Sequence, residues 1–354
     1  MLVLPKKVRC KRHCLAVHHS AKEIQTKTSG ANPQPFHGQE SARIMNGALL
    51  LSQLINGLQY GLLLFLVAAG LTLVFGILDF VNLAHGAFYM LGAFVSATIT
   101  AASGSWPLAL LLSPLVVALL ALPAERLVAR PLYGASPLAQ VLATFGLLLV
   151  IEALAMLVWG TEGRGVPLPA WLRGHVTVFG AILPTYRILI VAIGLLVAAA
   201  AFLLIHRTRF GMQVRATASN RAMAEALGID TVALEARIFA FGAGLAALAG
   251  VLVAPLSEAS LAMAFEVIII AFVVIIIGGL GSLMGAFIAA LLVGMIDTMG
   301  RAFLDDLLRA VLSAEAAETA APAISSMSIY LFMALVLAIR PAGLFPPRTR
   351  GRRP

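Results

Sequence analysis

The chain has 354 residues, of which 60% are hydrophobic and 12% are charged, and its mean hydropathy is +0.97. A soluble domain carries roughly twice that fraction of charge, so the composition excludes an ordinary soluble protein. The net charge of +9 is no argument for nucleic-acid binding, because residues 1–44 hold eight Lys/Arg and two Glu and supply +6 of it. The remaining 310 residues, with seventeen Arg and fourteen acidic residues, supply only +3.

Residues 1–44 differ in composition from all that follows, because they contain every lysine and both cysteines of the chain. Cys10 and Cys14 lie in the pattern C-x-x-H-C, but this spacing matches no standard zinc site. We interpret the segment as a basic disordered tail with no metal. We expect translation to begin at Met45, with residues 1–44 absent or dispensable; the alternative is a tail kept on the cytoplasmic side by an even number of spans.

Five stretches carry no charged side chain, namely residues 48–78, 188–205, 238–257, 267–296 and 319–339. A membrane helix needs about 20 apolar residues, so these stretches predict membrane spans. We expect one all-α, polytopic membrane domain over residues 45–354, with about eight to nine transmembrane helices. In chain order the expected spans are 48–77, 81–102, 107–125, 138–159, 188–206, 236–254, 264–280, 283–300 and 324–340.

Arginine placement predicts the orientation of these spans. Nine spans put segments 126–137, 207–235 and 341–354 on one side, which holds twelve Arg including the flanking Arg237 and Arg340. The opposite side holds five Arg. Positive residues are enriched in cytoplasmic loops, so we expect the first side, with the C-terminus, to be cytoplasmic.

A polar and Gly-rich block, GLTLVFGILDFVNLAHGAFYMLG, interrupts the apolar sequence at residues 70–92. Each polar group in hydrocarbon needs a partner, water or a cavity to face. Asp79 and Asn82 lie six and three residues before His85, so a helix over this block would place them on one face with it. We expect these three residues to lie at the translocation path or in its supporting polar network, although a helix–helix hydrogen bond by His85 explains it equally well.

The longest predicted cytoplasmic segment, within residues 207–235, contains the run R-A-M-A-E-A-L-G. Ser219 or Asn220 can cap a short helix there, and Gly228 can end it. A membrane protein has little need for such a helix unless a partner docks on it. The alternative is an ordinary solvated loop helix.

These motifs resemble one known family. The run from LINGLQYG at Leu54 through N-x-A-H-G to MLGA at Ala93 is similar to the first-helix motif of the permease subunits of branched-chain amino-acid ABC importers, in the shorter of their two subtypes. Similar blocks follow in the same order at residues 215–230, 239–255, 271–286 and 340–345. The resemblance therefore covers about residues 48–345.

The resemblance implies an inner-membrane permease that translocates leucine, isoleucine and valine, with urea, amides or other amino acids as alternatives. The implied partners are a second permease subunit, two ABC ATPase subunits and an extracytoplasmic substrate-binding protein. It also implies that the cytoplasmic loop contacts an ATPase, through a set of residues comprising Arg215, Asn220, Ala224, Glu225, Ala226, Leu227 and Gly228.

Ionisable residues and glycines within the predicted spans are further candidates for a functional or structural role. Glu152, Glu266 and Asp297 lie in predicted spans, where ionisable residues are functional candidates, with ion pairing to Arg as the structural alternative. Glycines permit close helix contacts and tight turns. We expect those roles for Gly57, Gly61, Gly278, Gly279, Gly281 and Gly285.

The chain shows no Walker A sequence, catalytic triad spacing or H-E-x-x-H motif. We therefore expect no enzymatic activity and no cofactor, with ATP hydrolysis by separate chains. A secondary transporter remains a rival and would transport alone with an ion gradient. A membrane-embedded enzyme is the third reading, but it needs a catalytic constellation that is not evident.

Overall fold

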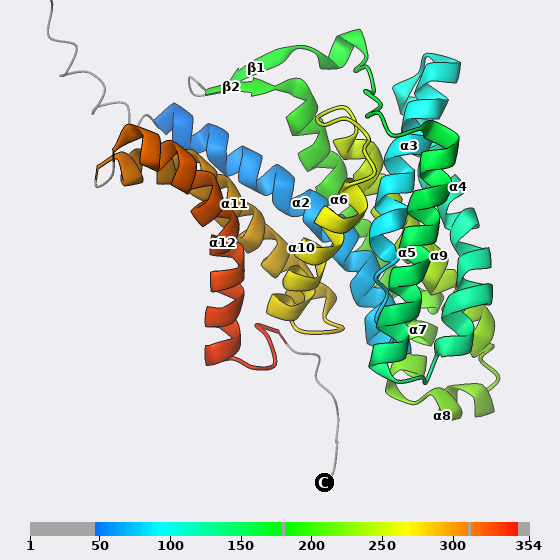
Figure 1. Cartoon of the computed structure of the whole chain (residues 1–354). Coiled ribbons are helices and arrows are strands. Elements are labelled where there is room, and N and C mark those ends of the chain that lie inside the picture. The colour runs from blue at the N-terminus through cyan, green and yellow to red at the C-terminus, as the bar shows by residue number, and fades with distance from the viewer. Residues whose placement is uncertain (1–46, 179–180, 311–312, 346–354) are drawn as a thin grey trace, which may run out of the picture. The chain divides into compact units, whose positions relative to one another are not determined.

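The computed structural model describes residues 47–345, apart from 179–180 and 311–312. The predicted basic tail at 1–44, the predicted start at Met45 and the arginines of 348–354 lie outside these residues. The described chain is a helical domain in which a two-stranded hairpin supplies the named strands (Figure 1).

Most helices follow the predicted spans within a few residues, but the last two extend into the predicted connection between residues 300 and 324, one ending at Arg309 and the other beginning at Ala314. Seven helices are long and apolar enough to cross a membrane, and the two parts of α12, bent by 40°, add an eighth if they form one span. A further apolar helix, α10, has only 16 residues. In chain order the elements are α2 (Gly47–Leu78), α3 (His85–Ser103), α4 (Trp106–Ala124), α5 (Pro137–Trp159), α6 (Thr185–Arg207), α7 (Arg209–Ser219), α8 (Arg221–Ala226), α9 (Thr231–Val253), α10 (Met263–Gly278), α11 (Leu283–Arg309) and α12 (Ala314–Ile339).

Short elements join these helices. A π-helical turn, η2 (Glu125–Ala129), and a 3-10 turn, η3 (Arg130–Leu132), continue α4 toward α5. Between α5 and α6 lie the 3-10 turn η4 (Ala170–Leu172) and the antiparallel strands β1 (His175–Val178) and β2 (Ala181–Pro184).

Helices α2 and α9 form the centre of the domain. Helix α2 packs on α6, α9, α10 and α11, and α9 also packs on α3 and α4. Glycines allow the close approach of α2 and α11, because a Cβ on Gly61 would lie only 2.9 Å from the carbonyl oxygen of Ala290 and the Cα of Leu291. In contrast, α4, α5 and α6 expose much of their apolar surface, as expected of faces that meet lipid or another subunit.

The loops gather into two sets. On one face, the chain after α12 returns to α10, where the Leu344 N–H donates to the Ile277 carbonyl at 2.8 Å. The α8 and η2 elements contact α9 on this face, which carries eight of the described arginines (listed by position: 126, 130, 207, 209, 215, 221, 237 and 340). On the other face, Arg164 and Ala259 form an isolated β-bridge between two loops. Figure 1 shows α8 and the hairpin at opposite ends of the helices.

Candidate functional site

The polar block breaks the helical backbone. Residues 79–84 are not helical, and side chains of α5 accept hydrogen bonds from two of their backbone N–H groups. The Val81 N–H donates to Gln140 Oε1 at 3.1 Å, and the Leu83 N–H donates to Thr144 Oγ1 at 3.1 Å. Non-helical backbone at membrane depth persists only where its polar groups find such partners. Gln140 and Thr144 therefore hold the break between α2 and α3 in place.

The prediction that the span begins at residue 81, with Asp79, Asn82 and His85 on one helical face, is wrong. Helix α3 begins at His85, and the three side chains separate. Asp79 is exposed, with a left-handed φ of 48° that ends α2. Asn82 and His85 are buried, and both polar atoms of the Asn82 side chain lack a partner in the described structure. The helix does not extend over residues 79–84 because Gln140 and Thr144 of α5 accept hydrogen bonds from the backbone N–H groups of Val81 and Leu83.

His85 lies against the backbone of α2. Its Nε2 lies 3.1 Å from the carbonyl oxygen of Val67, a geometry that fits a neutral ring donating from Nε2. Gly70 makes room for the ring, because a Cβ there would lie 2.9 Å from Nε2. His85 therefore contacts α2 at Val67, a residue that also lines a cavity.

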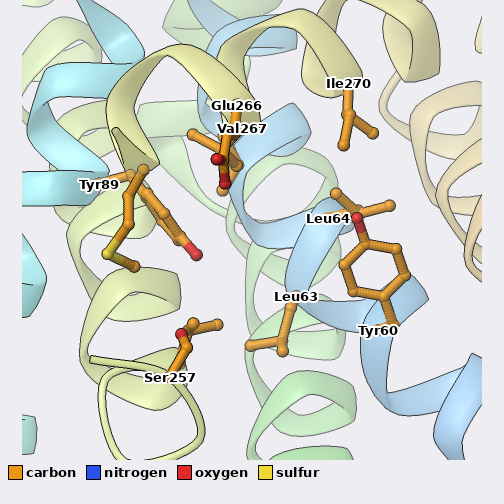
Figure 2. Close-up of a pocket in the computed structure, with 11 residues that line it drawn as sticks. Tyr60, Leu63, Leu64, Tyr89, Ser257, Glu266, Val267 and Ile270 are labelled. Carbon is orange, nitrogen blue, oxygen red and sulfur yellow. The ribbon is translucent and has the colours of Figure 1, made fainter. Parts of the chain in front are cut away.

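The cavity lies between α2, α3, the end of α9 and α10 and has a volume of about 220 Å³. Figure 2 shows the lining residues drawn from these four regions. Most of the wall is apolar, and its members are Leu63, Leu64, Val67, Val253, Met263, Val267 and Ile270. A small concave site with an apolar wall and a few polar groups is the usual form of a ligand site.

Four polar side chains complete the wall, namely Tyr60, Tyr89, Ser257 and Glu266. The sequence singles out Glu266 alone, because an intramembrane carboxylate is conspicuous. An isolated tyrosine in an apolar helix is typical of a packed core, so the two tyrosines give no signal of their own. No sequence spacing connects the four residues, since each comes from a different element.

The other predicted intramembrane acids lie outside this cavity. Asp297 is buried in α11 and forms an ion pair with Arg301 one turn later, at 3.0 Å. Glu152 lies half-buried on α5. The structure therefore gives Asp297 the ion-pair role and brings neither residue to the cavity.

The loop after α6 folds into two short helices. Thr208 caps α7 through Gly211, and Asn220 caps α8 by accepting a 3.0 Å bond from the Met223 N–H. Gly228 follows α8 with a φ of +85°, a backbone conformation that other residues adopt at a cost. The predicted cap and stop of the short helix are therefore present.

Glu225 lies in a network within the chain. It accepts hydrogen bonds from Thr231 Oγ1 at 2.7 Å and from Arg221 Nε at 3.1 Å, and both lower its pKa below the ordinary value, the Thr231 bond most. Arg221 also pairs with the buried Glu235 at the start of α9, at 2.8 Å. This network ties α8 to a helix at the centre of the domain.

Large apolar side chains of the segment face outward. Met223 is 57% exposed and Leu227 is 75% exposed. Ala224 is buried beneath them and Ala226 is exposed, while the Arg215 guanidinium donates to the Ile205 carbonyl at the end of α6. The segment therefore presents two exposed apolar side chains, Met223 and Leu227, beside a Glu225 side chain that is 49% exposed.

The predicted glycines lie at helix contacts and turns. Gly57 and Gly61 face the backbone of Gly294 in α11, whereas Gly278 and Gly285 pack against each other. The remaining two, Gly279 and Gly281, have positive φ in the turn between α10 and α11. The described residues hold no group of three or more His, Cys, Asp or Glu able to bind a metal.

The profile of the family described as "Branched-chain amino acid transport system / permease component" matches residues 53–339. The chain belongs to this permease family. It is 31% identical over 307 residues to the high-affinity branched-chain amino acid transport system permease protein BraD of Pseudomonas aeruginosa, covering 83% of this chain and 95% of BraD.

Two relatives from Escherichia coli also match. The high-affinity branched-chain amino acid transport system permease protein LivH is 30% identical over 312 residues, covering 83% of this chain and 94% of LivH. The inner membrane ABC transporter permease protein YjfF is 38% identical over 117 residues, covering 30% of this chain and 35% of YjfF. No solved structure matches the chain.

Proposed function

We propose that this chain is the permease subunit of an ATP-binding-cassette importer that carries leucine, isoleucine and valine across the inner membrane. The substrate class comes from the names of BraD and LivH, and the ABC assignment from the name of YjfF. The partners are a second permease subunit, two ATPase subunits and an extracytoplasmic binding protein.

The observation that carries the proposal is the α8 segment. A short helix presents exposed Met223 and Leu227 while Arg221 ties it to Glu235 of α9. A solvated loop gains little from exposing apolar side chains, whereas a helix that fits a partner's groove uses them as anchors. An ATPase cleft is the partner that fits an importer.

The arginine-rich face holds this segment, so we place that face and the C-terminus in the cytoplasm. The hairpin and the loops joined by Arg164 and Ala259 then face the binding protein. On this placement the first described helix, α2, begins on the extracytoplasmic side.

The mechanism follows from the contacts of α9. Closure of the ATPases on ATP would move α8, and the Arg221–Glu235 pair would pass that movement to α9. Helix α9 packs on α2, α3 and α4, so its displacement shifts the helices that surround the cavity. Rigid-body shifts of this kind alternate the access of a central site between the two sides.

Site-specific crosslinking tests the docking. Residues 45–354 contain no cysteine, so Met223→Cys and Leu227→Cys each introduce a single thiol beside α8 once Cys10 and Cys14 are replaced. We expect both to crosslink to a cysteine in the ATPase cleft, and Thr177→Cys in β1, the control, to give none. Equal crosslinking from all three positions, or from none while the complex is intact, contradicts the proposal.

Uptake measurements on two variants test the coupling role of the α8 segment. Glu225→Arg replaces the carboxylate that accepts hydrogen bonds from Thr231 and Arg221 with a positive charge. Gly228→Leu places a residue with a side chain at a backbone position that has a positive φ. Both variants should reach the membrane and lose uptake. Normal uptake with normal ATPase binding in both would overturn the coupling assignment.

A further inference from the structure

The cavity between α2, α3 and α10 carries four polar side chains with no protein partner. Among the described residues, none forms a hydrogen bond or ion pair with the side chains of Tyr60, Tyr89, Ser257 or Glu266. Tyr89 is buried and Tyr60 is half-buried, whereas Ser257 and Glu266 are exposed, and all four line the same cavity. A buried hydroxyl is costly unless it is paired or hydrated. Such an arrangement is expected where a polar ligand or water completes the bonding.

In the part of the chain that the structure describes, the Glu266 carboxylate forms no ion pair. The three acids that are buried in the described helices each have one, since Glu125 pairs with Arg130, Glu235 with Arg221 and Asp297 with Arg301. Glu266, in the first turn of α10, is an exposed residue that lines the cavity. Figure 2 shows its carboxylate and the Tyr89 hydroxyl directed into the same space.

The rest of the wall suits an aliphatic group. Leu63, Leu64, Val67, Val267 and Ile270 line the space around the four polar side chains. The volume of about 220 Å³ far exceeds the roughly 10–15 Å³ that admits one water. It lies below the roughly 300–1,000 Å³ of sites for drug-sized ligands, so it fits a small molecule.

We propose that this cavity binds a small zwitterionic amino acid during its passage, with Glu266 as the acceptor for the α-ammonium group. The hydroxyls of Tyr60 and Tyr89 donate to the α-carboxylate, and the apolar wall receives the aliphatic side chain. A carboxylate paired with an ammonium forms the stronger, charge-assisted type of hydrogen bond. This inference rests on the proposed import of amino acids and assigns the permease a selection step of its own.

The test uses the assembled importer in nanodiscs without its binding protein, so that only the membrane site reports. Binding of radiolabelled leucine is measured for the wild type, Glu266→Gln, Glu266→Asp and Tyr89→Phe. We expect Glu266→Gln to weaken binding by about tenfold or more, Tyr89→Phe by a few-fold, and Glu266→Asp to retain part of it. The matched controls, Glu162→Gln in an exposed loop and Tyr330→Phe on α12, should bind like the wild type.

Competition identifies the group that Glu266 binds. Leucinamide keeps the ammonium and should displace leucine, whereas 4-methylpentanoate lacks it and should not. Equal competition by both compounds, displacement of leucine by sodium or potassium ions alone, or wild-type affinity in Glu266→Gln would each overturn the assignment. The same complexes are assayed for ATP-driven leucine uptake with the binding protein: uptake by the wild type together with any of these results refutes the cavity alone, whereas absence of wild-type uptake refutes the proposed function.

Discussion

The link between α8 and α9 gives the sharpest quantitative prediction. Arg221 pairs with Glu235 at 2.8 Å, and the Glu235 side chain is only 4% exposed whereas that of Arg221 is 48% exposed. Breaking a fully buried pair costs about 3–5 kcal/mol, and an exposed pair is worth about 0–1 kcal/mol. Because one partner is half in solvent, we expect Arg221→Ala to cost about 1–2 kcal/mol of α8 docking.

That cost corresponds to a roughly 5- to 30-fold larger population of undocked α8. Hydrogen exchange of the amides of residues 221–228, measured on the assembled importer, should accelerate by that factor, with a fall in the substrate moved per ATP hydrolysed. Arg209→Ala, an exposed arginine of α7 on the same face, is the matched control and should change neither quantity.

Exchanging the charges of Arg221 and Glu235 distinguishes the effect of the ion pair from the effect of losing either side chain. Arg221→Glu with Glu235→Arg should recover part of both readouts that either single change loses. Unchanged exchange and an unchanged transport-to-hydrolysis ratio in Arg221→Ala would show that this pair does not carry movement from α8 to α9.

The contacts of His85, Gly61 and Glu225 each predict the effect of a substitution. His85→Leu removes the bond to the Val67 carbonyl and should lower uptake more than membrane assembly, which uptake per assembled complex measures; normal kinetics would contradict the supporting role. Gly61→Leu places a side chain against the backbone of α11 and should abolish the folded complex in size-exclusion chromatography, whereas Gly146→Leu, in open space on α5, should not. Hydrogen bonds lower the pKa of Glu225, so the stabilisation that its carboxylate gives α8 is complete above pH 4.5, the ordinary pKa, and is lost as the pH falls through the lower folded pKa. Hydrogen exchange of the α8 amides should therefore accelerate at low pH. In Glu225→Gln this pH dependence should disappear.

The sequence is most informative where local chemistry decides the structure. The uncharged runs predict the long helices, because a membrane leaves the backbone few alternatives. The Asn220 cap and the Gly228 stop are likewise local, since each acts within a few residues of its own position.

The features that the sequence did not predict depend on contacts between residues distant in sequence. The break at 79–84 extends past the span start predicted at residue 81, and the residues that stabilise it, Gln140 and Thr144, lie about 60 positions later. The cavity is assembled from four elements, so the positions of Tyr60 and Tyr89 beside Glu266 follow only from the packing of α2, α3 and α10. No spacing rule in one sequence contains that information.

Reconstitution in proteoliposomes tests whether this chain acts as an ATP-dependent importer subunit. The chain is placed in proteoliposomes with its second permease and two ATPases, the binding protein is added outside, and uptake of radiolabelled leucine is measured. We expect uptake that requires ATP inside, the binding protein outside and this chain in the membrane. Leucine uptake by this chain alone, driven by an ion gradient and indifferent to ATP, would contradict it.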